Sequence, residues 1–288
     1  MTERLAEVGA RIEGIRQLGA VVNAMRGIAA ARAQRARGQL GSVERYTETI
    51  AAAIRQALAL LPIIRPDGAR RPRGPALVLF CAEQGFAGAF SERILDAAAE
   101  GLAKESAKPR IYLLGTRGGT VARGRGVSPT WSSPMPAHSD GIPRLADRVA
   151  EALYADIANG TIDQLDAVSS RWTPGHGATI EHRRLFPIDV AIVAPAVVTA
   201  CPIVNLGPAV LLRELTAAYI HAELCTASLH AFAAENEARL QAMSAAHSQI
   251  DRQLAALQAA QRIVRQNEIT EEIIELAAGE TASRSGRG

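Results

Sequence analysis

The sequence predicts an α/β fold in which two long terminal helices pair as an antiparallel coiled coil, with a small, mostly parallel α/β domain between them. Three observations support this prediction. All 14 prolines lie from Pro62 to Pro208, apolar residues in both proline-free ends recur at coiled-coil spacing, and the middle alternates between strand and helix patterns. We expect an N-terminal helix over 1–61, the α/β domain over 62–204, a C-terminal helix over 205–279 and a frayed tail over 280–288.

The N-terminal segment has a narrow apolar seam. Its seam residues recur at spacings of three and four: Leu5, Val8, Ile12, Ile15, Gly19 and Val22. This spacing is typical of a coiled coil. The following stretch "VVNAMRGIAAARAQRARGQL" (21–40) offers a thin stripe made mostly of Ala and one Met, with Arg around it. So thin a stripe indicates that a further surface completes the burial of this helix.

The C-terminal segment continues the same pattern through Ile250, Leu254, Leu257 and Val264. At about 1.5 Å per residue, a helix over 209–277 would be on the order of 100 Å long. No globular domain of this size covers such a length. Antiparallel pairing with the first helix buries both seams.

The middle segment predicts buried strands over 75–81 ("PALVLFC") and 110–115 ("RIYLLG"). Helix patterns follow them, one with Ser91 as an expected N-cap and one over 139–160 with Pro143 near its first turn. The stretches "LDAVSSRWT" and "ATIEHRRLFPI" predict two more strands that pair around "PGHG". This alternation predicts a Rossmann-like domain with a mostly parallel sheet.

The motif search predicts no catalytic, cofactor-binding or metal-binding residues. The Gly-rich stretches "EQGFAGAF" and "GTRGGTVARGRG" follow strands, where phosphate-binding loops occur, but neither carries a P-loop lysine nor a strict G-x-G-x-x-G. The six histidines form no ligand array, and the isolated Cys81, Cys201 and Cys225 lie in no nucleophile motif.

Charge and aromatic content favour a protein partner over nucleic acid. The net charge is only +3, and Tyr46 is the single aromatic residue in the first 60, so the basic helix lacks stacking platforms for bases. No secretory signal or run of about 20 apolar residues is present. The residues by themselves leave open a coiled-coil scaffold or nucleic-acid-associated adaptor with an α/β head, and a diverged Gly-loop enzyme.

The two ends carry a family resemblance. "RIEGIRQLGAVVNAMRGIAAARAQRAR" (11–37) resembles the N-terminal helix of the gamma subunit of F-type ATP synthases. "ENEARLQAMSAAHSQIDRQLAALQAAQRIVRQNEITEEIIELAAG" (235–279) resembles its C-terminal helix without a gap. "AEQGFAG" (82–88) stands where that family has an acidic residue and a Gly-Leu-Cys-Gly turn.

The resemblance implies a central rotor shaft that couples transmembrane ion flow to ATP synthesis or hydrolysis in an alpha/beta hexamer. Such a subunit has no catalytic site and no cofactor of its own. Its implied partners are the alpha and beta subunits, the epsilon subunit and the membrane rotor ring of c subunits, with no nucleic acid. Its implied location is peripheral, on the cytoplasmic face of the bacterial inner membrane.

The resemblance also implies contacts with beta subunits. Met25 and Arg26 match the family's Met-basic pair beside the beta lever, and Arg239, Gln266, Thr270 and Glu272 match positions that contact beta loops. The chain departs from the family at "AMRGI", where Ala-Met-Lys-Met-Val is usual, and at Gln261 and Arg262, where Tyr-Asn is usual. Such departures are typical of a diverged second-copy enzyme.

Overall fold

The computed structural model describes residues 2–60, 74–102, 108–173, 175–188 and 204–285. They divide into a helix-pair unit (Met1–Ile28 with Leu240–Gly288) and an α/β unit (Ala29–Arg239). The long helices α1 (Thr2–Leu58) and α6 (Pro208–Ser285) contribute to both units. The division therefore falls inside the helices, whereas the sequence analysis placed boundaries at their ends. The expected boundary between 61 and 62 lies outside the described residues.

The helix-pair unit buries the predicted seam. Val22, Met243 and Ile250 form its core, and Met25 is among the half-buried residues that pack on it. A Cβ at Gly19 would lie 3.3 Å from Cγ2 of Ile250, and one at Gly9 would lie 4.0 Å from Nε2 of Gln261. Because the partner number rises as the α1 number falls, the two helices are antiparallel, as predicted.

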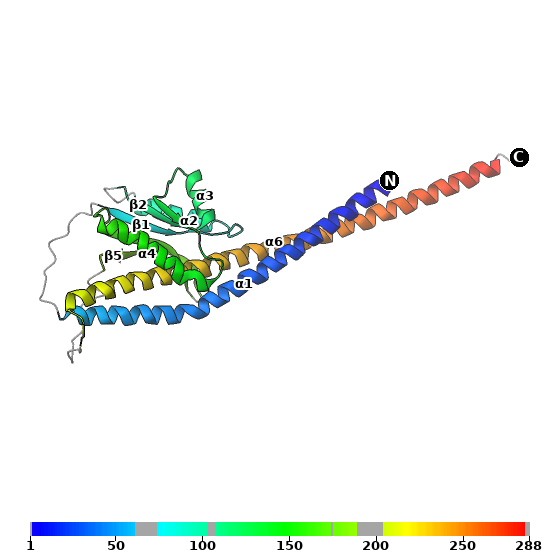
Figure 1. Cartoon of the computed structure of the whole chain (residues 1–288). Coiled ribbons are helices and arrows are strands. Elements are labelled where there is room, and N and C mark those ends of the chain that lie inside the picture. The colour runs from blue at the N-terminus through cyan, green and yellow to red at the C-terminus, as the bar shows by residue number, and fades with distance from the viewer. Residues whose placement is uncertain (1, 61–73, 103–107, 174, 189–203, 286–288) are drawn as a thin grey trace. The chain divides into compact units, whose positions relative to one another are not determined.

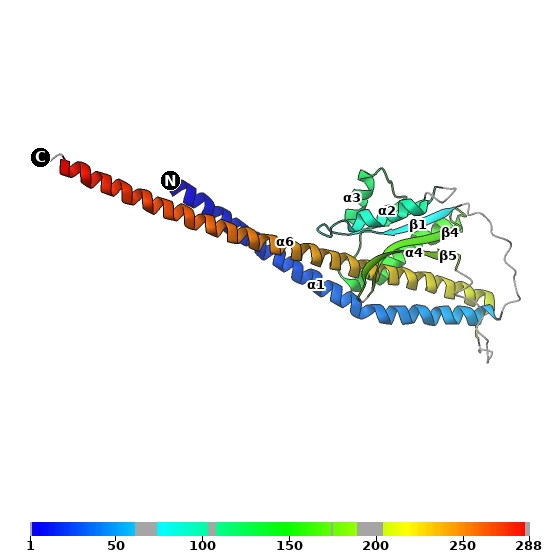
Figure 2. The ribbon, with the colours of Figure 1, turned by 180° about the vertical axis from the view of Figure 1, so that it is seen from behind.

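The end of α6 extends past the start of α1 (Figures 1 and 2). This helix continues to Ser285. The backbone is therefore helical over 280–285, in the stretch where a frayed tail was expected. The final stretch of α6 is a single helix without α1 beside it.

The α/β unit contains one five-stranded sheet. Its strands are β1 (Pro75–Phe80), β2 (Arg110–Leu114), β3 (Trp131–Ser133), β4 (Gln164–Thr173) and β5 (Gly177–Phe186), in the order β3-β2-β1-β4-β5. All neighbours are parallel except β4 and β5, which form the predicted antiparallel pair. The mostly parallel α/β domain is thus confirmed.

Helices cover both faces of this sheet (Figure 2). On one face, α2 (Phe90–Leu102) and α3 (Thr116–Gly124) pack on alternate residues of β1, including Leu77 and Leu79. On the other face, α4 (Ile142–Ala158) and parts of α1 and α6 pack on Val78 and Phe80. Burial on both faces explains why β1 reads as an uninterrupted apolar run.

Charged side chains join the helices of this unit to its sheet. Glu44 of α1 accepts from Arg171 of β4 at 3.0 Å and lies 3.1 Å from Nε2 of the buried His230 of α6. The guanidinium of Arg37 lies 4.1 Å from the ring centroid of Trp172 and also pairs with Glu237. These contacts bring α1, α6 and β4 together around one polar cluster.

Candidate functional site

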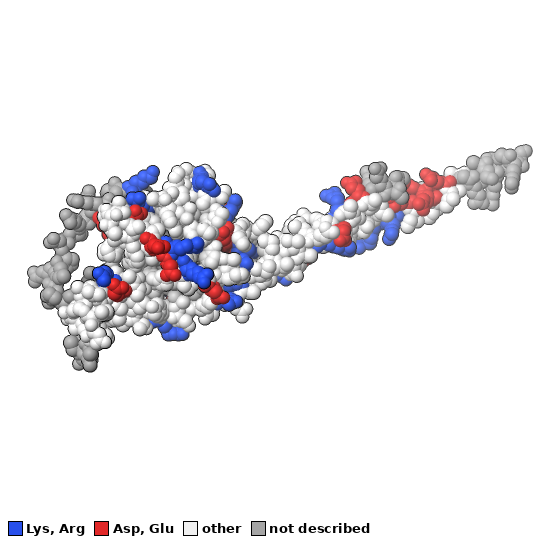
Figure 3. Space-filling view, viewed as in Figure 1, with Lys and Arg blue, Asp and Glu red and all other residues white. Residues whose placement is uncertain are grey.

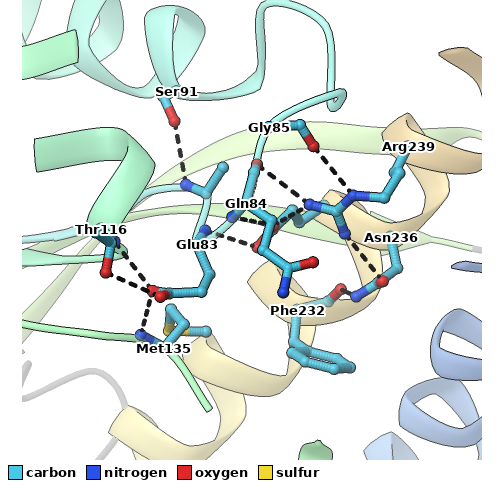
Figure 4. Close-up of polar contacts among 11 residues, drawn as sticks. Glu83, Gln84, Gly85, Ser91, Thr116, Met135, Phe232, Asn236 and Arg239 are labelled. Atoms are coloured by element: carbon cyan, nitrogen blue, oxygen red, sulfur yellow. Dashed lines mark hydrogen bonds and ion pairs between the residues drawn. The ribbon is translucent and has the colours of Figure 1, made fainter. Parts of the chain in front are cut away.

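Loop 82–88 follows β1 at the carboxyl edge of the sheet, where ligands of α/β folds usually bind. Its Glu83 carboxylate faces back into the protein (Figure 4). It accepts hydrogen bonds from the backbone N–H and the hydroxyl of Thr116, at 2.9 and 2.8 Å, and from the backbone N–H of Met135 at 2.8 Å. One carboxylate thus joins the loops that follow β1, β2 and β3.

Glu83 also occupies the anion position that the Gly-rich stretch offers. Helix α3 begins at Thr116, inside the stretch that sequence analysis compared with a phosphate-binding loop. Exposed amides at a helix N-terminus attract anions. Here the Thr116 amide binds the Glu83 carboxylate, while the Arg117 and Gly118 amides bond to the carbonyl oxygens of Glu83 and Ala82. The geometry therefore leaves these amides satisfied by the chain itself.

Helix α6 holds the same loop from the other side. The Glu235 carboxylate accepts from the backbone N–H groups of Glu83 and Gln84, each at 3.2 Å. Arg239 donates to the carbonyl oxygens of Gln84 and Gly85, both at 3.2 Å, and to the Glu235 carboxylate. Figure 4 shows the Arg239 guanidinium directed at the main chain of the loop.

Arg239 was expected to contact beta subunits, and within this chain its guanidinium is bonded to loop 82–88. The side chain is only 5% exposed, and it also donates to Oδ1 of Asn236 at 3.1 Å. With its guanidinium used inside the α/β unit, we assign Arg239 an internal role. Sequence reasoning missed its partner Glu235, although the spacing of four on a helix was a signal that could have paired them.

Two further features of the loop were not predicted. Helix α2 begins at Phe90, and Ser91 accepts from the backbone N–H of Ala82 at 3.1 Å, so the expected N-cap role of Ser91 is wrong. Phe86 has a φ of 61° and is 67% exposed. A left-handed conformation is unfavourable for an aromatic residue, so the bonded main chain on its N-terminal side holds Phe86 in place.

The described cysteines are poor nucleophiles. Burial raises the pKa of Cys81 to about 12, and the nearby Glu235 and Glu92 carboxylates add to the effect. Burial, with a contribution from Asp147, also raises the pKa of Cys225 to about 12. Because the thiolate is the reactive form, both thiols stay protonated and inert near neutral pH. Cys201 lies outside the described residues.

The other predicted site residues belong to the helix-pair unit. Met25 is half-buried against the Val22, Met243 and Ile250 core. Arg26 donates to Oδ1 of Asn23 at 2.8 Å. Gln266, Thr270 and Glu272 are exposed on α6, and the Thr270 hydroxyl donates to the Gln266 carbonyl oxygen at 2.8 Å. Gln266 and Thr270 are four residues apart and share one face of α6, whereas Glu272 faces another side of the helix.

Apolar side chains are also exposed in the helix-pair unit. Five such residues of α6 are each between 51% and 75% exposed: Ile263, Ile269, Ile273, Ile274 and Leu276. Leu18, Val21 and Ile28 of α1 are similarly exposed. Acidic side chains gather near the end of the described part of α6 (Figure 3). Exposed apolar groups in this number on a narrow helix pair are typical of a protein-binding surface.

Metal-binding clusters and membrane-spanning helices are both absent from the described residues. No three His, Cys, Asp or Glu side chains in the described ranges lie close enough together to hold a metal ion. No helix within the part of the chain that the structure describes is both long and apolar enough to span a bilayer.

A family model described as ATP synthase matches residues 4–282. The chain belongs to the ATP synthase family. Among curated relatives, the ATP synthase gamma chain of Parafrankia sp. (strain EAN1pec) is 28% identical over 99% of this chain and 100% of the relative. The gamma chain of Nocardia farcinica is also 28% identical, over 98% of each chain.

Solved structures of the ATP synthase family share the fold. A chain of the Euglena gracilis mitochondrial ATP synthase, in an OSCP/F1/c-ring structure, has a TM-score of 0.69 at 14% identity, covering 100% of this chain and 97% of that one. A rotor chain of the same organism's enzyme has a TM-score of 0.66 at 11% identity, covering 93% of this chain and 100% of that one. Together, the family match and the gamma-chain relatives confirm the expected fold class and the role as a non-catalytic rotor shaft.

Proposed function

We propose that the helix-pair unit turns inside the alpha/beta hexamer of a bacterial ATP synthase, and that its contacts with beta subunits involve Met25, Arg26, Gln266, Thr270 and Glu272. The α/β unit then lies toward the epsilon subunit and the membrane rotor ring of c subunits. The whole chain is peripheral, on the cytoplasmic face of the inner membrane. Ion flow through the membrane part drives its rotation.

The exposed surface of the helix-pair unit is the observation that carries this proposal. Its apolar side chains need a surrounding apolar wall, because they have no cover within the described chain. Gln266, Thr270 and Glu272 lie among them as exposed polar groups. Exposed polar pairs contribute little binding energy, typically about 0–1 kcal/mol. Contacts of this strength can form and break as a shaft turns.

The proposed roles divide the chain into a shaft and a foot. The first and last helices form the shaft over 1–61 and 205–279, and residues 62–204 form the foot. Support for the foot comes from its sheet, whose core is completed by residues of α1 such as Leu40 and of α6 such as Leu224. A close-packed core of this kind lets the foot and these parts of the two helices act as one rigid body.

Co-expression with alpha and beta subunits tests the proposal. The full chain should copurify with both, in a complex that hydrolyses ATP. Replacing Gln266, Thr270 and Glu272 together by Ala should reduce ATP-driven rotation or ion translocation. The matched control replaces the exposed Arg148 and Glu151 of α4 by Ala and should leave both unchanged. Failure of the unmodified chain to join alpha and beta would contradict the proposal.

A further inference from the structure

We propose that Glu235 and Arg239 of α6, together with loop 82–88, form a polar clamp that holds α6 against rotation within the α/β unit and carries torque between this helix and the sheet. The inference rests on the proposed function, because only a rotating shaft needs such a clamp. Glu235 and Arg239 are positioning residues in this scheme. They act on the main chain of the loop and not on a nucleotide.

The buried face of α6 is mixed in size within the α/β unit. It carries large side chains such as Leu224 and Phe232 and, directly before Glu235, the small Ala233 and Ala234. Large side chains oppose turning where they interlock as ridges in grooves. Apolar burial is itself non-directional, so the small side chains next to Glu235 add little resistance to rotation about the helix axis. Directional bonds at this end of the contact add to that resistance.

Glu235 and Arg239 supply bonds of fixed direction. They are four residues apart and therefore lie on one face of the helix. Glu235 accepts from the N–H groups of Glu83 and Gln84, and Arg239 donates to the carbonyl oxygens of Gln84 and Gly85. Rotation of α6 in either direction would pull these atoms out of hydrogen-bonding geometry, which tolerates only small changes in distance and angle.

Burial strengthens the clamp. Glu235 is 3% exposed and Arg239 is 5% exposed, so water has little access to replace a broken bond. In a low-dielectric setting, a charged group that loses its partner remains uncompensated. The pair therefore has one strongly favoured arrangement.

The clamp continues into the sheet through Glu83. Its backbone N–H is bound by Glu235, while its own carboxylate binds the Thr116 and Met135 amides. These residues follow β1, β2 and β3, so α6 is tied to the carboxyl ends of three neighbouring parallel strands. A force on α6 is thereby shared by several strands and does not bend one loop alone.

Variants in the complete synthase test the inference. Arg239→Gln, Arg239→Lys and Glu235→Gln are placed in the full chain, and ATP hydrolysis and ATP-driven ion translocation are measured in the same membrane vesicles. Loss of directional bonds by Arg239→Gln should lower ions moved per ATP by about fivefold while hydrolysis changes by less than about twofold. Arg239→Lys keeps the positive charge but loses the planar guanidinium with its several N–H donors, so the number of ions moved per ATP should be intermediate.

The matched control is Arg35→Gln, which breaks an exposed ion pair with Asp140 in the same unit and should leave the ratio unchanged. An Arg239→Gln complex that moves as many ions per ATP as the unmodified one overturns the inference. If the variants do not assemble, hydrogen exchange of the unmodified complex decides. The Glu83 and Gln84 amides should exchange as slowly as the core of β1, and fast exchange there also overturns it.

A different result would contradict the proposed function itself. In that case, the unmodified chain would not copurify with alpha and beta subunits at all. Loss of ion translocation per ATP in an assembled, hydrolysing variant complex supports the clamp. Assembly with full coupling in every variant removes the clamp but leaves the rotor-shaft function intact.

Discussion

At the residue scale, half-buried charged side chains surround the buried His230 where α1 and α6 meet the sheet. His230 of α6 lies beside Glu44 of α1, and Arg171 of β4 and Glu181 of β5 also face this cluster. Burial lowers the pKa of His230, although the hydrogen bond to Glu44 opposes this effect. The folded chain therefore favours neutral His230.

This lowered pKa predicts acid sensitivity of folding. In the unfolded chain the pKa of a histidine is about 6.5. As the pH falls from about 6.5 toward the lower folded pKa of His230, the unfolded state binds more protons, so the free energy of unfolding decreases. His230→Gln should make this decrease shallower. Urea unfolding followed by circular dichroism between pH 7.5 and 5 measures it.

The control for that experiment is His138→Gln, because His138 is exposed and its replacement removes a histidine without changing the charged residues around His230. Burial raises the pKa of Glu223, which acts in the opposite sense, since a raised folded pKa adds stability as the pH falls. The difference between wild type and His230→Gln isolates the histidine. An equal pH dependence in both proteins would refute the assignment.

At the scale of elements, long periodic segments were predictable and short ones were not. The two long helices, the buried strand β1 and the β4–β5 pair follow from periodicity and proline placement. Helix α3 was missed because "TRGGTVARG" resembles a loop. A Cβ at Gly118 would lie 2.0 Å from Cβ of Cys81, so this glycine serves close packing and does not mark a turn. Strand β3 has only three residues, too few for a period.

The site was less predictable than the fold. Gln266, Thr270 and Glu272 are exposed as a partner-binding role requires, and their contacts remain a prediction. Arg239 could not be placed from sequence, because its acceptors on Gln84 and Gly85 are about 150 residues away along the chain. Tertiary contacts of that separation leave no local pattern.

The end of α6 carries a prediction about assembly. Deleting 280–288 should leave complex recovery and ATPase activity nearly unchanged, because these residues lie beyond the exposed apolar group. Deleting 266–288 removes Ile269, Ile273, Ile274 and Leu276, each worth up to about 1.5–3 kcal/mol if fully buried by a partner. The longer deletion should therefore weaken assembly and torque. Both truncations are compared for complex yield and hydrolysis, and equal damage would show that the apolar group has been assigned to the wrong residues.

At the scale of the whole molecule, the proposed clamp gives a Rossmann-like sheet a mechanical role. The carboxyl edge, which binds ligands in many α/β proteins, is used here to hold α6. Glu83 takes the position of an anion and connects three loops. The edge of the sheet that would support nucleotide binding in other α/β proteins thus joins α6 to the sheet in this chain.

The isolated chain should accordingly not bind ATP tightly. The α3 N-terminal amides are already satisfied by Glu83 and Ala82, and no P-loop lysine is present in the sequence. Equilibrium dialysis with labelled ATP should show no saturable binding at micromolar concentrations. Tight binding of one ATP per chain would mean that this edge opens in solution.

The exposed apolar stretch of α6 also governs the fate of a newly made chain. Before partner subunits arrive, Ile273, Ile274 and Leu276 face water. Such residues associate with any apolar surface that they meet, including other copies of the chain. Synthesis in excess over alpha and beta should therefore yield insoluble aggregates. With the proposed arrangement of alpha and beta subunits around α6, balanced production of the subunits should protect the chain, and the rate of assembly should set how much of it survives.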